Sequence, residues 1–452
     1  MKKFIGTKEF YLTTIAIALP IMAQQFVTSF VNLIDNIMIG SVGSLALTSV
    51  TVSNRIYLLF NSTLFGLSGA SGIFIAQHYG AKNHEKTQKI LNINLVCGLL
   101  VSCFFVLVLI FIPEKILRIF TDNPEVINSS LAYLKYVLLA YIPYSISMST
   151  MMALRAVGIN KIQLAVGLVS VATNTVLNYL LIFGHFGFPM LGLQGAAVAT
   201  AIARWVEMCI YLIVLVRHKH YFKLDIKGMI RLDLEMISVM IKKAIPLTLN
   251  EVLFSMATSI IFIAYSRCNE TLIPAISVVD TVMQIAYIIF SGLSSAVSIL
   301  IGNKLGANEL SEAKENANKL IAFGVVVGMC ITVMIFIVAP LIAEFYNVES
   351  FVKAAIVTLL RIKSCLLPIY VYDVCIFFVL RAGGDTLSTL IMDSGVLWCL
   401  NVTVSTVVSV YFDIPLVYLY AIVESMDVLK LFIASYFYKK GKWLKNITIG
   451  MT

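Results

Sequence analysis

Long apolar runs recur along the whole chain, and they constrain its fold more than any other feature. A helix needs about 20 mainly apolar residues to cross the hydrocarbon core of a bilayer. Twelve runs of this kind are present: residues 11–34, 45–77, 90–112, 131–154, 162–183, 192–216, 244–265, 271–302, 318–341, 354–380, 387–411 and 414–438. The sequence therefore predicts an all-α integral membrane protein with twelve transmembrane helices.

Composition supports a lipid bilayer as the surrounding medium. Hydrophobic residues make up 60% of the chain and charged residues only 13%, whereas a soluble domain is closer to half apolar and a quarter charged. The net charge of +9 does not indicate a nucleic-acid partner. Lysine and arginine lie in the connections between runs, and no basic stretch is interleaved with aromatic residues for base stacking.

The basic residues also predict the orientation of the chain. If the N-terminus is cytoplasmic, the inside segments carry 23 Lys and Arg and the outside segments carry 4. Cytoplasmic connections are enriched in these residues, so we expect both termini in the cytoplasm and a multi-pass protein of the plasma (inner) membrane. The first run continues past Ile34 without a cleavage site, and we expect it to be retained as a span.

The chain repeats itself at an offset of 226 residues. Segment 66–81, at the end of the second run, resembles segment 292–307, at the end of the eighth. The same offset relates Pro20 to Pro246, residues 154–156 to 380–382, and Arg204 to Lys430. Six spans in each half give both halves the same orientation, so we expect two pseudo-symmetric six-helix bundles related by an axis along the membrane normal.

These boundaries predict three parts: an N-terminal lobe over 1–216, a cytoplasmic linker over 217–243 and a C-terminal lobe over 244–452. Residues 224–237 of the linker mix apolar and charged positions at helical spacing, which indicates a helix at the membrane surface. A simple connection is favoured over a regulatory role for this segment.

Motifs of soluble enzymes are missing from the sequence. It contains no GxxxxGK[ST] loop for nucleotide phosphates, no HExxH motif and no Cys/His cluster with metal-ligand spacing. The eight cysteines form no CxxC pair and are expected to pack as small apolar residues. We therefore expect neither an enzyme nor a bound cofactor.

Polar side chains within the apolar runs are the candidates for function, because an ionisable group in the bilayer is costly and normally faces a partner or a wet cavity. Asp35 lies at the outer end of the first run, Asn174 and Asn178 lie one turn apart in the fifth, and Thr200 lies in the sixth. Their oxygens suit a hard cation, and Asp35 could equally accept a proton. The alternative is that the asparagines only hold helices together.

Charged pairs on one helix have a simpler structural interpretation. Arg204 and Glu207, like Asp427 and Lys430, are three residues apart and share a helix face. Asp35 and Glu251 have no basic residue three or four positions away on their own helices, which makes them the stronger functional candidates.

Four segments together resemble the multidrug and toxic compound extrusion (MATE) family of transporters. They are residues 35–40 followed by Leu45 and Ala46, residues 66–81, residues 192–201, and residues 380–386. The resemblance extends over the whole chain. It implies a bacterial secondary active transporter that exports small organic, cationic compounds in exchange for H+ or Na+ by alternating access, and that acts as a monomer.

The resemblance also implies site residues. The cation-coupling positions match Asp35, Asn174, Asn178 and Thr200, with Na+ held at the first three. A substrate or second cation site matches Glu251, Asp373 and Tyr370. Two departures stand out: some members have aspartate where Asn178 stands, and Tyr370 occupies a position that is acidic in some members, with Asp373 nearly one turn away.

Two other functions remain open at this point. The superfamily includes flippases for lipid-linked sugars, and a non-transporting membrane receptor or scaffold belongs to another class. Transport is favoured because intramembrane carboxylates and a two-half repeat suit alternating access.

Overall fold

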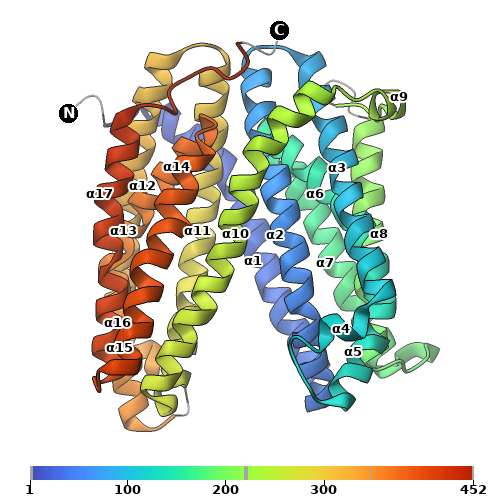
Figure 1. Cartoon of the computed structure of the whole chain (residues 1–452), viewed down its shortest axis with the longest axis vertical. Helices are drawn as coiled ribbons and strands as arrows, with labels where there is room; N and C mark the ends of the chain where they lie inside the picture. Colours follow the sequence, from blue (N-terminus) through green and yellow to red (C-terminus); the bar gives the residue numbers. More distant parts are fainter. Residues whose placement is uncertain (1–3, 218–221, 347, 450–452) are drawn as a thin grey trace. The chain divides into compact units, whose positions relative to one another are not determined.

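The computed structural model describes residues 4–217, 222–346 and 348–449, which are almost entirely helical (Figure 1). Lys2, Lys3 and Lys219, which contribute to the predicted orientation, and linker residues 218–221 lie outside this part. The first elements are α1 (Lys8–Val42), α2 (Ser44–Gly80), α3 (His84–Phe111), α4 (Pro113–Leu117), α5 (Pro124–Val137), η1 (Leu138–Ala140), α6 (Tyr141–Ala156), α7 (Asn160–Phe183), η2 (His185–Gly187), α8 (Leu193–Arg217) and α9 (Ile226–Ile230). The later elements are α10 (Leu234–Cys268), η3 (Glu270–Leu272), α11 (Ile273–Gly306), α12 (Leu310–Glu344), α13 (Ser350–Ala382), α14 (Thr386–Leu390), η4 (Ile391–Gly395), η5 (Leu397–Val402), α15 (Thr403–Tyr411), α16 (Leu416–Ser425) and α17 (Asp427–Lys440).

Eleven helices in the described ranges are long and apolar enough to cross a membrane, by length and composition. They include two composite spans, Pro124–Ala156 from α5, η1 and α6, and Thr386–Tyr411 from α14, η4, η5 and α15. The twelfth predicted run, 414–438, forms α16 and α17. Each of these two helices is by itself too short to cross a membrane. Met426 between them keeps right-handed helical angles (φ −60°, ψ −24°). The predicted all-α membrane fold is confirmed, with an interruption in its last run.

Backbone conformation repeats at the same offset as the sequence. A positive φ is uncommon for residues other than glycine, yet Lys82 (φ 58°) and Asn308 (φ 62°) both adopt one, 226 residues apart. Gly158 (φ 83°) and Gly384 (φ 72°) form a second pair with that separation. The two halves therefore repeat in local structure as well as in sequence.

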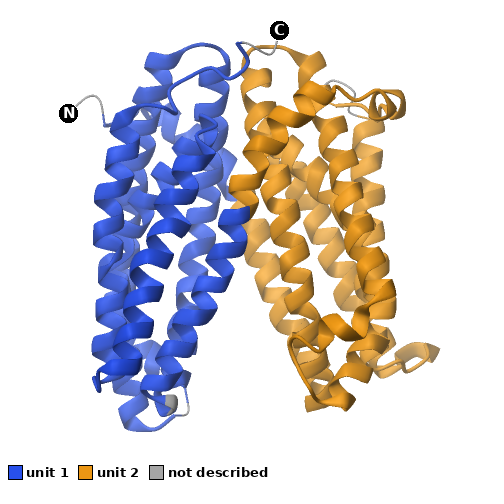
Figure 2. Cartoon of the chain, viewed as in Figure 1, with its two compact units in different colours: residues 1–19, 249–452 blue, residues 20–248 orange. Residues whose placement is uncertain are grey.

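Contacts divide the chain into two compact units, residues 20–248 and residues 1–19 with 249–452 (Figure 2). This division differs from the predicted lobe boundaries, because α1 and α10 each contribute residues to both units. The lobes 1–216 and 244–452 and the linker 217–243 remain our proposal for the extent of the repeats.

The first turns of α1 pack within the unit that contains the later residues. The Tyr11 ring lies 4.9 Å from that of Phe323, and the Lys319 ammonium lies 5.5 Å from the centre of the Phe10 ring. The start of α10 packs within the other unit, where the Ser71 hydroxyl donates to the sulfur of Met240 on α10 at 3.3 Å.

The same unit contains a close helix contact at a glycine. A Cβ on Gly66 of α2 would overlap the backbone of Thr248 on α10. Glycine is therefore required for α2 and α10 to approach at this point.

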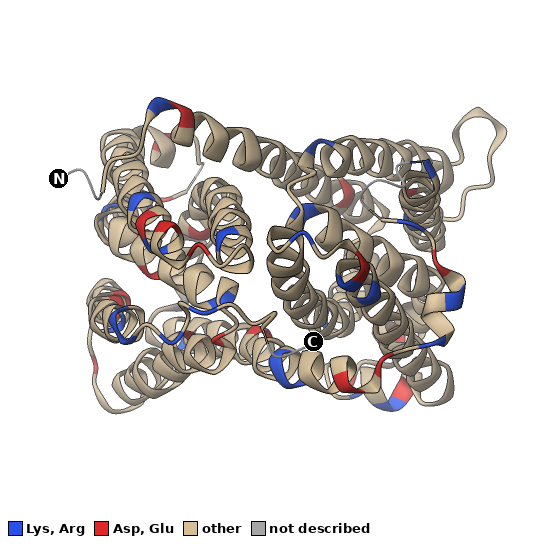
Figure 3. Cartoon of the chain, turned by 90° about the horizontal axis from the view of Figure 1, so that it is seen from above, with Lys and Arg blue, Asp and Glu red and all other residues tan. Residues whose placement is uncertain are grey.

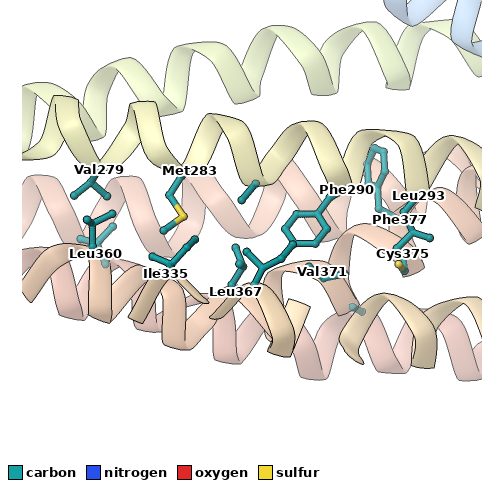
Figure 4. Packing of buried hydrophobic residues seen from close by; sticks show 14 of the residues in the cluster. Val279, Met283, Phe290, Leu293, Ile335, Leu360, Leu367, Val371, Cys375 and Phe377 are labelled. Atoms are coloured by element: carbon teal, nitrogen blue, oxygen red, sulfur yellow. The ribbon is translucent and has the colours of Figure 1, made fainter. Parts of the chain in front are cut away.

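Each unit has its own apolar core. Figure 4 shows part of the one in residues 249–452, where Met283 and Phe290 of α11 pack with Ile335 of α12 and with Leu367 and Val371 of α13. Outward-facing side chains are also apolar. On α12 they lie at helical spacing and are 53–69% exposed: Val326, Met329, Val333 and Ile337. These faces suit contact with lipid, whereas lysine and arginine lie mainly in connections and near helix ends (Figure 3).

Candidate functional site

A cavity of about 460 Å³ lies within residues 20–248. Its walls come from α1, α2, α5, η1, α6, α7 and α8. All four predicted cation-coupling residues line it: Asp35, Asn174, Asn178 and Thr200. The consecutive helices α7 and α8 thus bring their polar side chains to that of the distant α1.

Hydrogen bonds join these four side chains in a row. The Asn178 amide nitrogen donates to Asp35 Oδ1 at 2.8 Å and lies 3.4 Å from Asn174 Oδ1. The Asn174 amide nitrogen in turn lies 3.4 Å from Thr200 Oγ1. The spacing of Asn174 and Asn178 explains why both face the same cavity, because residues four apart share a helix face.

Asn178 is the most buried of the four, with 1% of its surface exposed. Its amide nitrogen serves Asp35, but its Oδ1 atom is buried without a hydrogen-bond partner. A buried acceptor without a donor is costly. The four side chains therefore include a carboxylate, which can accept a proton, and an amide oxygen without a partner; both are oxygen ligands of the kind that bind hard cations.

A second polar group lies in the wall of the same cavity. Arg204 Nη1 is 2.7 Å from Glu207 Oε2, so the predicted pair on α8 is confirmed. Ser170 Oγ also donates to Glu207 at 3.1 Å. The Arg204 guanidinium lies 4.8 Å from the centre of the Tyr144 ring, and the Tyr144 hydroxyl donates to Asn61 Oδ1 at 2.5 Å.

The sequence did not identify the aromatic residues of the cavity. Tyr57, Tyr133, Tyr141 and Tyr144 all line it. One signal was available for Tyr57: Asn54, Tyr57 and Asn61 are three and four residues apart, so they form a polar stripe on one face of an apolar helix.

The candidates in the other unit do not repeat this arrangement. Glu251 of α10 lies with Oε1 3.9 Å from Nη1 of Arg381, a basic partner from α13 that helical spacing alone does not reveal. Tyr370 of α13 packs its ring against Tyr287, with centroids 4.9 Å apart. Asp373, also on α13, is only 2% exposed, and neither of its carboxylate oxygens has a hydrogen-bond partner.

Lys430 corrects one expectation from the sequence. Its ammonium lies 2.5 Å from Asp393 Oδ1, on a different helix, rather than pairing with Asp427 on its own. The Asn250 amide completes this group by donating to Asp393 Oδ2 at 3.0 Å. The pairing brings together α10, the η4 segment and α17.

The offset of 226 residues shows how far the two units have diverged at these positions. The counterparts of Asp35, Asn174 and Asn178 are Ile261, Leu400 and Val404. The row of oxygen ligands therefore has no copy in the second repeat. In the described residues there is no group of three or more His, Cys, Asp and Glu side chains that could hold a metal ion.

The chain is similar in sequence to a known family and to several known proteins. The MatE family model matches residues 20–180 and 246–419. The probable multidrug resistance protein YoeA of Bacillus subtilis is 24% identical over 395 residues, which cover 87% of this chain and 85% of that protein. The probable multidrug resistance protein NorM of Listeria monocytogenes is 24% identical over 329 residues, covering 73% and 72%.

Solved structures show the same fold. An outward-facing multidrug resistance MATE transporter aligns with a TM-score of 0.86 and 16% identity, covering 95% of both chains. A mutant of the Vibrio cholerae MATE transporter VcmN aligns with a TM-score of 0.87 and 18% identity, covering 96% of this chain and 97% of that one.

Proposed function

Because this chain belongs to the MatE family of membrane transporters, we propose that it is a secondary active multidrug exporter that exchanges small organic cations for H+ or Na+ by alternating access. The observation that carries the proposal is the hydrogen bond from Asn178 to Asp35 at the wall of the cavity. It holds one carboxylate beside neutral oxygen donors, where a coupling ion can bind.

The charges in the cavity wall would make the coupling ion and the cationic compound compete. Arg204 offsets Glu207, so an ionised Asp35 leaves one negative charge in excess among these three residues. That excess favours a cationic compound. A proton or Na+ at Asp35 removes the excess and weakens the hold on the compound, and by reciprocity the compound promotes release of the ion.

The Asn178 side chain suits both states of Asp35. An ionised carboxylate is best served by the amide nitrogen that now donates to it. A protonated Asp35, or one with Na+ bound, is best served by the amide oxygen, which has no partner in this structure. Na+ would be held by Asp35, Asn174 and Asn178, with Thr200 as a further oxygen donor. Rotation of the Asn178 side-chain amide would thus accompany ion binding.

The cavity also suits the proposed compounds in size and lining. Small-molecule sites occupy roughly 300–1,000 Å³, and 460 Å³ falls in this range. Tyr57, Tyr141 and Tyr144 provide aromatic faces, which attract organic cations.

We place both termini in the cytoplasm and the chain in the plasma membrane of a bacterium, acting as a monomer. The basic residues of the connections support this orientation. Glu251, Asp373 and Tyr370 form our proposed substrate or second cation site. The buried, unbonded carboxylate of Asp373 supports it, because an intramembrane acid normally serves an ion or a partner.

The test is efflux of a cationic dye from proteoliposomes under an imposed pH or Na+ gradient. We expect one of the gradients to drive efflux by the wild-type protein, and Asp35→Asn to lose gradient-driven efflux by at least about tenfold, since ion binding no longer biases the two states. Glu114→Gln removes an exposed carboxylate paired with Arg118 and should behave as wild type.

Two results would contradict the proposal. Full coupled efflux by Asp35→Asn would remove this residue from ion coupling. Movement of a fluorescent lipid between leaflets, without efflux of the dye, would favour a flippase instead.

A further inference from the structure

The segment between α8 and α10 is held firmly on α3 rather than hanging as a loose connection. The side chain of Gln88 on α3 accepts from the Lys223 backbone N–H and donates to its carbonyl, both at 2.9 Å. The Asn92 amide donates to Asp225 Oδ2 at 3.2 Å. Phe222 is buried, with 2% of its surface exposed. The segment therefore presents a defined surface.

The turn that begins α9 adds to this rigidity. Asp225 Oδ1 accepts from the Gly228 backbone N–H at 3.0 Å, and a Cβ at Gly228 would collide with the Asp225 carboxylate and the Asn92 amide. The hydrogen bond from the Gly228 N–H lowers the pKa of Asp225 below its ordinary value, and the bond from the Asn92 amide adds to this effect. The carboxylate therefore stays ionised at neutral pH and is occupied in holding the turn.

This fixed segment displays large aliphatic side chains. Ile226 is 62% exposed, and Ile230 and Leu234 are each 79% exposed. They recur every four residues, and α9 is too short to bury them against another helix. Exposed aliphatic residues on a rigid support, at the end of membrane-spanning helices, need an apolar environment.

Basic residues recur at the same interval. Lys223, Lys227 and Arg231 are all exposed, and two of them directly follow the exposed isoleucines in sequence. Two of the nearby acidic side chains hold turns of the backbone: Asp225 caps α9, and Asp233 caps α10 by accepting from the Glu235 and Met236 backbone N–H groups at 3.0 and 3.1 Å. Within residues 222–234 the three basic side chains outnumber these two carboxylates, and the exposed Glu235 follows the segment.

We propose that residues 222–234 form a binding surface for anionic phospholipids of the cytoplasmic leaflet. The aliphatic side chains enter the boundary between headgroups and acyl chains, and Lys223, Lys227 and Arg231 contact lipid phosphates. The lipid would fix the start of α10 and the first turns of α3, where Gln88 and Asn92 bind the segment. The inference does not depend on which compound or ion is transported.

The test is hydrogen–deuterium exchange of the full chain in nanodiscs. One set of nanodiscs contains phosphatidylcholine alone. In the second set, half of the phosphatidylcholine is replaced by phosphatidylglycerol. We expect the amides of 222–234 to exchange several-fold more slowly with phosphatidylglycerol. The triple variant Lys223→Gln, Lys227→Gln, Arg231→Gln should lose this difference, because each basic side chain near an anionic surface contributes on the order of fivefold in binding.

A matched control removes the same charge elsewhere. Lys439, Lys440 and Lys442 are also exposed, and replacing all three by Gln should preserve the slower exchange. Ile226→Ser with Ile230→Ser should lose it although the charge is unchanged. Identical exchange of 222–234 in the two membranes would overturn the proposal. The proposal would also be overturned if the control variant lost the slower exchange to the same extent. It would be overturned as well if inorganic phosphate slowed the exchange of these amides in phosphatidylcholine nanodiscs.

Discussion

At the scale of single residues, the two candidate sites differ in how their carboxylates are held. Asp35 accepts a short hydrogen bond from a neutral amide, whereas Glu251 lies 3.9 Å from the guanidinium of Arg381. A neutral neighbour leaves a carboxylate ready to take up an ion. A basic neighbour competes with the ion and must be displaced or neutralised first.

The amides around Asp35 are expected to contribute unequally. Asn178→Ala removes the 2.8 Å bond that stabilises ionised, ion-free Asp35, and a hydrogen bond to a charged group contributes about 1.5–3 kcal/mol, so proton affinity should rise by roughly 10–100-fold. Affinity for Na+ should fall instead, because the same change deletes the Asn178 Oδ1 ligand. Asn174→Ala removes only 3.4 Å contacts and should have a smaller effect. The measurement is the ion concentration that gives half-maximal efflux.

The control for this series is Asn61→Ala. Asn61 also lines the cavity but is bonded to Tyr144, so its removal should leave the ion dependence unchanged. An Asn174→Ala effect larger than that of Asn178→Ala would contradict the arrangement described here.

Glu251 provides a separate prediction. Glu251→Gln keeps the shape of the side chain but removes its attraction to Arg381, and we expect slower efflux with normal membrane insertion. Initial rates in proteoliposomes, normalised to the amount of reconstituted protein, measure the effect. Glu344→Gln, which loses an exposed carboxylate paired with Lys353, should transport normally. A normal rate for Glu251→Gln would leave its carboxylate with a structural role only.

At the scale of helices, the packing of α7 against α8 depends on one position. A Cβ at Gly195 of α8 would lie 2.5 Å from the Leu181 carbonyl oxygen of α7 and 2.6 Å from its carbon. The backbones therefore approach as closely as they do because residue 195 is glycine. These helices carry Asn174, Asn178 and Thr200.

Gly195→Ala should consequently lower stability. Overpacking a close contact costs about 1–3 kcal/mol, and the melting temperature of the protein in detergent should fall. Gly72→Ala, in a helix where an added Cβ meets nothing within 4 Å, should leave it unchanged or raise it. Equal melting temperatures for both variants would show that α7 and α8 can separate at no cost.

Helices were the part of the structure that the sequence predicted best. Apolar runs of this length predict helical spans because a helix satisfies all its backbone hydrogen bonds within one segment, and eleven runs correspond to helices long enough to span in the part of the chain that the structure describes. The break at Met426 carries no such signal, because α16 and α17 together still form one apolar run. The π-helical η4 and η5 segments were likewise unpredicted.

Contacts between helices were predicted only where the sequence contained a direct clue. Spacing placed Asn174 and Asn178 on one face, and their meeting with Asp35 and Thr200 rested on family resemblance. The pairing of Lys430 with Asp393 and that of Glu251 with Arg381 depend on which helices are neighbours. Neighbours are set by tertiary packing, which the spacing along one helix does not contain.

At the scale of the whole molecule, the orientation in the membrane is the prediction that is simplest to test. Ser41 and Lys82 lie just beyond the two ends of α2, whose 37 residues span about 55 Å, longer than a bilayer core. Cysteines at these positions, in a background without the eight native cysteines, should react with a membrane-impermeant reagent from opposite sides. Lys82→Cys should react from the cytoplasm. Reaction of both from one side would be incompatible with the proposed topology.

The grouping of residues 1–19 with residues 249–452 has a consequence for how the chain is made. A ribosome releases the first turns of α1 long before it reaches Lys319 and Phe323, which contact Phe10 and Tyr11. At about 5–20 residues per second, the delay is roughly 15–60 s. During that time the first turns of α1 have not yet packed against α12. The unit of residues 20–248 can be completed in the order of translation, whereas the unit that contains residues 1–19 cannot.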